Sequence, residues 1–82
     1  MAQVRSISAG AQSVRRHPTE VDCFYSIVAD AEGELLHLST FGSDDRKSPA
    51  KSSQSIQLSE AIAGELLQVI LETFPSLHRQ TS

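Results

Sequence analysis

The sequence predicts an α+β fold, in which a small antiparallel β-sheet is followed by one C-terminal α-helix. Three observations support this prediction. Residues 20–41 contain two apolar segments around a polar turn, residues 53–58 alternate between polar and apolar, and residues 60–74 have a helical period. With 82 residues the chain forms one small domain. Such a domain buries a modest share of its surface, so a dimer partner is expected.

The first two strands are expected at residues 21–29 and 34–41 and form a hairpin. Both segments are rich in β-branched, aromatic or leucine side chains, which favour strands. Between them, residues 30–33 read Asp-Ala-Glu-Gly. Gly33 can adopt a positive φ, so this polar segment is typical of a hairpin turn.

A third strand is expected at roughly residues 53–58, and alternation assigns the side chains of all three strands to two faces. One face is expected to form the core with Tyr25, Ile27, Leu36, Leu38, Ile56 and Leu58. The opposite face is expected to present Phe24, His37, Phe41, Ser55 and Gln57.

The helix is expected to begin after Ser59, a good N-cap, and to end before Pro75. Its apolar side chains span an arc of roughly 200°, whereas packing on one sheet face needs only a stripe somewhat over 100° wide. A second copy of the chain is expected to cover the surplus, which predicts a homodimer through the helix. The alternatives are that Leu77 or the N-terminal arm covers it. The expected dimer interface contains Ala63, Leu67, Leu71 and Phe74.

The folded domain is expected to span residues 19–77. Residues 1–18 are rich in Ser, Ala, Gln and Arg and show no alternation, so they are predicted to be a flexible basic arm. An additional strand from this arm stays open as an alternative. Residues 78–82 are a tail.

The composition argues against catalysis, metal binding and membrane insertion. Cys23 is the only cysteine, and the three histidines lie in different segments, so no metal and no cofactor are expected. No nucleophile elbow or phosphate-binding loop is present, so the protein is not expected to be an enzyme. The absence of a long apolar run and of a signal peptide, together with the single cysteine, predicts a cytoplasmic protein.

The loop at residues 43–51 carries three cations, although the formal net charge of the chain is −3. A net acidic domain is a poor non-specific binder of duplex DNA. Cations, hydroxyls and amides on a loop nevertheless suit phosphate contacts, and unpaired bases stack on exposed aromatic rings. The candidate nucleic-acid-binding residues are Phe41, Arg46, Lys47, Lys51, Ser53, Ser55 and Gln57. The alternative is that Phe24 and Phe41 form a second small core under the N-terminal arm.

The turn Glu32-Gly33, the loop residues Lys47, Pro49 and Lys51, and the strand-to-helix junction carry a family resemblance. The junction residues are Ile56, Leu58 and Ser59. Residues 21–74 resemble the DNA-binding half of the positive-cofactor-four family of transcriptional coactivators. The resemblance implies a curved antiparallel sheet followed by a helix, dimerisation through the helices, and a grip on single-stranded DNA by the sheets and loops. The family pattern also has a more basic loop, an aromatic residue early in the helix and a further strand at the start.

Two functions are therefore expected, from different classes. The first is a homodimeric, non-catalytic module that binds single-stranded nucleic acid and is related to transcription. The alternative is a protein-interaction module, either an accessory subunit or an inhibitor of a larger bacterial or phage complex. This second module would use the acidic residues 30–34 and the apolar side of the helix.

Overall fold

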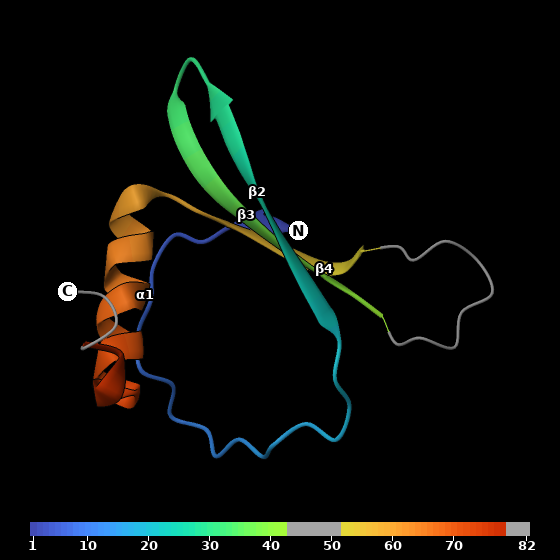
Figure 1. Cartoon of the computed structure of the whole chain (residues 1–82), viewed down its shortest axis with the longest axis vertical. Helices are drawn as coiled ribbons and strands as arrows, with labels where there is room; N and C mark the ends of the chain where they lie inside the picture. Colours follow the sequence, from blue (N-terminus) through green and yellow to red (C-terminus); the bar gives the residue numbers. More distant parts are fainter. Residues whose placement is uncertain (43–51, 79–82) are drawn as a thin grey trace.

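The structure is a computed structural model that describes residues 1–42 and 52–78. In these ranges a four-stranded β-sheet is followed by one α-helix and a short 3-10 helix (Figure 1). The elements are β1 (Ala2–Gln3), β2 (Asp22–Asp30), β3 (Gly33–Phe41), β4 (Ser52–Leu58), α1 (Glu60–Thr73) and η1 (Pro75–Leu77). The predicted α+β class, with a hairpin, a third strand and a C-terminal helix, is confirmed.

The strand order is β1-β4-β3-β2, and the sheet is mixed instead of purely antiparallel. Strands β2, β3 and β4 pair antiparallel, whereas β1 pairs parallel with β4, with Ala2 opposite Ile56. The amide of Val4 extends this pairing by donating to the Gln57 carbonyl at 2.9 Å. The sequence showed no strand in residues 1–18, because two residues are too few for alternation to appear. The edge of β4 nevertheless offers backbone groups that a short strand can pair with.

The hairpin has the expected register, from Asp22 opposite Phe41 to Asp30 opposite Gly33. At the tip, the Asp30 carboxylate accepts a hydrogen bond from the amide of Glu32 at 2.9 Å. Asp side chains stabilise turns through hydrogen bonds of this kind to the backbone two residues later. Gly33 has a φ of 125°, which side-chain-bearing residues rarely adopt, so the turn requires this glycine.

Gly33→Ala is expected to lower the free energy of unfolding by about 1–3 kcal/mol, because an alanine must adopt the strained φ. No atom lies within 4 Å of a Cβ added at Gly33, so the loss comes from the backbone alone. Gly64 is the matched control, because it lies in α1 with equally open space. Gly64→Ala should stabilise the protein by about 0.5–1 kcal/mol. Urea unfolding followed by circular dichroism measures both, and a stabilising Gly33→Ala would contradict the turn geometry.

Helix α1 starts as the sequence predicts. The Ser59 hydroxyl accepts from the amide of Ile62 at 3.3 Å, and Glu60 lies in the first turn. The helix ends at Thr73, with Phe74 as its C-cap and Pro75 at the start of η1.

The core is smaller than predicted. Among the described residues, the buried apolar side chains are Leu58 and Ile62. The expectation that Tyr25, Ile27 and Ile56 join them is wrong, because Tyr25 is 72% exposed, Ile27 is 66% exposed and Ile56 is also exposed. Only Ser59 separates β4 from α1, so the helix packs against β3 and β4 and leaves β2 uncovered. Figure 1 shows α1 at one side of the sheet, with β2 on the side away from it.

Candidate nucleic-acid interface

The sheet face directed away from α1 is called the outer face. Cross-strand pairing arranges it in rows: Phe24 lies opposite Ser39, and Ser39 lies opposite Ser55. In the next row, His37 lies opposite Gln57. Side chains of directly opposite residues point to the same side of a sheet, so alternation and register together define this surface. The outer face includes Gln3, Phe24, His37, Ser39, Phe41, Ser55 and Gln57.

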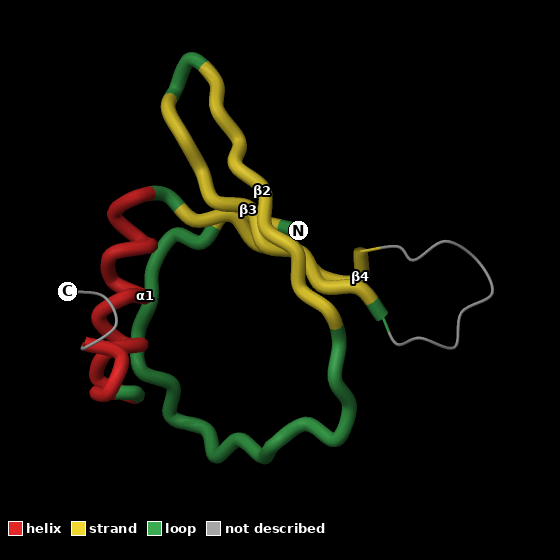
Figure 2. Tube along the Cα trace, viewed as in Figure 1, coloured by secondary structure: helices red, strands yellow, loops and turns green. Residues whose placement is uncertain are grey.

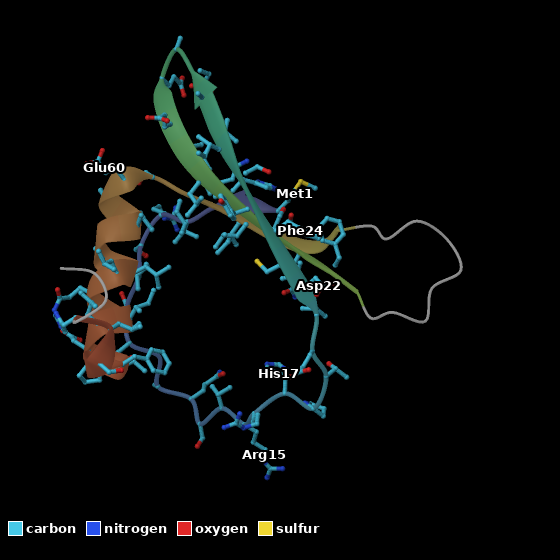
Figure 3. All side chains as sticks on the ribbon, viewed as in Figure 1. Met1, Arg15, His17, Asp22, Phe24 and Glu60 are labelled. Carbon is cyan, nitrogen blue, oxygen red and sulfur yellow. The ribbon has the colours of Figure 1, made fainter. Side chains whose placement is uncertain are left out.

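An aromatic pair occupies the β2–β3 side of the outer face. The ring centroids of Phe24 and Phe41 are 5.1 Å apart and the ring planes meet at 65°, an edge-to-face contact. Phe24 is 58% exposed, and Figure 3 shows it on a part of the sheet remote from α1. The N-terminal arm therefore does not bury Phe24, contrary to the alternative of a second small core. Phe41 packs against the ring of Phe24, and the Phe24 ring remains exposed to solvent.

A polar row lies beside the aromatic pair. The Gln57 side-chain nitrogen lies 3.1 Å from Nδ1 of His37. Because an amide nitrogen only donates, Gln57 donates and Nδ1 accepts. This contact uses the side-chain nitrogen of Gln57, so the side-chain oxygen Oε1 can accept a hydrogen bond from another partner. A hollow of about 260 Å³ adjoins the pair and is lined by Met1, Ala2, Gln3, His37, Ser55 and Gln57.

The structure brings Phe41, Ser55 and Gln57 of the predicted site together on the outer face. Ser53 lies in β4, but its side chain is outside the described part of the chain. Arg46, Lys47 and Lys51 also lie outside the described residues. The described residues Phe41 and Ser52, between which segment 43–51 lies in the sequence, are paired in the sheet.

Four outer-face residues were missing from the predicted site: Gln3, Phe24, His37 and Ser39. Alternation placed Phe24 and His37 on the correct face, so the signal for them was present. Gln3 reaches the hollow only through β1, for which the sequence carried no signal.

Arg15, a basic residue of the N-terminal segment, does not contribute to the outer face. Residues 4–21 contain no helix or strand, and Figure 2 shows them as one long connection between β1 and β2. Arg15 lies midway along it and points outward, away from the sheet (Figure 3).

The predicted helix interface is partly open to solvent. Leu67 is 50% exposed and Phe74 is 57% exposed, whereas Ala63 and Leu71 are half-buried. Within residues 1–42 and 52–78, no helix has the length and apolar character needed to cross a membrane.

Comparisons with protein-family models, with curated proteins and with solved structures found no match for this chain.

Proposed function

We propose that this protein is a small non-catalytic module that binds single-stranded nucleic acid on its outer face. The observation that carries the proposal is the exposed ring of Phe24, held edge-to-face by Phe41. A base stacked on an exposed aromatic ring contributes about 1–3 kcal/mol to binding. Bases are free to stack in this way only when they are unpaired, so the substrate is single-stranded.

The polar row supplies hydrogen bonds to the edges of such bases. The side-chain oxygen Oε1 of Gln57 can accept a hydrogen bond, and Ser55 and Gln57 line the same hollow. Amide and hydroxyl groups are common partners of unpaired base edges. The outer face therefore combines a stacking surface with neighbouring hydrogen-bonding groups, which is the combination that an unpaired strand requires.

The phosphates are assigned to Arg46, Lys47 and Lys51. These cations lie in the sequence between Phe41 and Ser52, which are paired in the sheet, so they are close in the chain to the aromatic pair. The net charge of −3 disfavours binding to any polyanion over the whole surface. Binding of the nucleic acid is therefore confined to the end of the sheet that carries Phe41. The resemblance to the positive-cofactor-four family supports the same substrate and a role in transcription, and the single cysteine favours a cytoplasmic location.

The salt dependence of binding tests the phosphate contacts. If three cations each neutralise one phosphate, the plot of log binding constant against log salt has a slope of about −2. The double variant Arg46→Ala with Lys47→Ala retains one cation, so its slope is expected to fall to about −0.7. Fluorescence anisotropy of a labelled oligo(dT) measures both slopes.

Arg5→Ala with Arg15→Ala is the matched control, because it removes the same charge from the N-terminal segment. Its slope should stay close to that of the wild type. Equal changes in the two double variants would show a general effect of net charge and would contradict the assignment to Arg46 and Lys47.

A further inference from the structure

Two apolar surfaces of this chain lack a cover. The first, called the inner patch, lies on the sheet face that carries α1 and consists of Tyr25, Ile27 and Ile56, all exposed. The second, called the helix flank, consists of Leu67 and Phe74 on α1 and at its C-cap, and both are also exposed. Large exposed apolar surfaces on a small protein mark sites of association.

One hollow lies between the sheet and α1, and Ile27 of the inner patch lines it. It has a volume of about 500 Å³, and its lining includes Ile27, Leu36 and Leu58 from the sheet and Ala63 from the helix. Tyr25 lies two residues from Ile27 on the same strand face. Leu67 follows Ala63 by four residues and so lies on the same side of the helix. An occupant of the hollow would therefore touch the inner patch and the helix flank together.

The exposed area of the chain is larger than that of an ordinary folded protein of its mass. The chain has a mass of 8.9 kDa and exposes 7631 Å². A compact monomer of that mass exposes about 4,800 Å². A standard interface buries about 800 Å² on each partner. The difference exceeds the area that a standard interface buries on each partner.

We propose that a second copy of this chain occupies the hollow and covers both apolar surfaces. A helix that packs on an uncovered sheet buries both elements. Under two-fold symmetry the helix flank of one copy meets the inner patch of the other, and the reverse contact follows from the same rotation. The interface is therefore larger than the helix-only interface that the sequence predicts, because Tyr25 and Ile27 belong to it.

Charge favours the same occupant. Glu34 and Glu60 lie at the rim of the hollow, and residues 21–42 carry four acidic side chains without a lysine or arginine. Residues 1–20 of the same chain carry three arginines against one glutamate. A second copy thus brings a basic segment as well as an apolar surface to an acidic rim.

Sedimentation velocity of the full chain without nucleic acid tests the proposal. The wild type is expected to sediment as a dimer of the 8.9-kDa chain. Tyr25→Ser and Leu67→Glu are each expected to convert it to a monomer. Because both side chains are exposed, the variants should keep their secondary structure, which circular dichroism verifies. If Leu67→Glu fails to fold, Leu67→Gln takes its place.

Val69→Glu is the matched control, because Val69 is exposed on the opposite flank of α1. This variant should remain a dimer. A monomeric wild type would overturn the proposal, as would co-purification with a different protein in place of a second copy. A dimer that Leu67→Glu dissociates but Tyr25→Ser does not would limit the interface to the helix and refute the part assigned to the inner patch.

Discussion

Leu58→Ala is expected to remove a large part of the protein's free energy of unfolding. Leu58 is 3% exposed, and within the described residues it shares the buried apolar core with Ile62 alone. Truncation of a buried leucine to alanine lowers the free energy of unfolding by about 2–5 kcal/mol. At about 0.05–0.15 kcal/mol per residue, a domain of this size has a total stability of roughly 4–12 kcal/mol. The substitution therefore removes a large part of the total free energy of unfolding.

Urea unfolding followed by far-ultraviolet circular dichroism measures this loss. Val69→Ala serves as the control, because Val69 is exposed on the helix. Its effect should stay within about 0.5 kcal/mol, as for other surface substitutions. Similar losses in the two variants would mean that Leu58 is not the centre of the core.

Phe24→Ala is expected to weaken oligo(dT) binding by roughly 5- to 150-fold, which corresponds to the loss of one stacked base. The ring of Phe24 is exposed and makes its edge-to-face contact with Phe41 only at one side. Its removal should therefore cost little stability. Anisotropy titration of the labelled strand measures the change in binding.

Phe24→Tyr is the conservative control, because it keeps an aromatic ring of the same size at the same place. The affinity of this variant should be close to that of the wild type. An alanine variant that binds as tightly as the wild type would remove Phe24 from the interface.

The local features of the fold were predictable from the sequence. The hairpin turn depends on Asp30 and Gly33, and the helix start depends on Ser59, so neighbouring residues carry the whole signal. Alternation likewise placed Phe24 and Phe41 on one face, and the structure shows their rings in contact.

The features that depend on distant parts of the chain were not predictable. Alternation identifies which residues share a face but not which part of that face a helix covers. The short connection at Ser59 decides this coverage and leaves Tyr25 and Ile27 exposed. The contact between His37 and Gln57 depends on the register of β3 and β4 across segment 43–51, which no local pattern fixes.

The most direct test of the central claim compares single-stranded and duplex ligands with the wild-type protein. Labelled oligo(dT), alone or annealed to oligo(dA), is titrated at low salt, and its fluorescence anisotropy is recorded. Binding on the outer face predicts a saturating rise for the single strand and a much weaker response for the duplex, whose bases cannot stack on Phe24. The absence of any rise with the single strand at low salt, or tighter binding of the duplex, would contradict the proposed function.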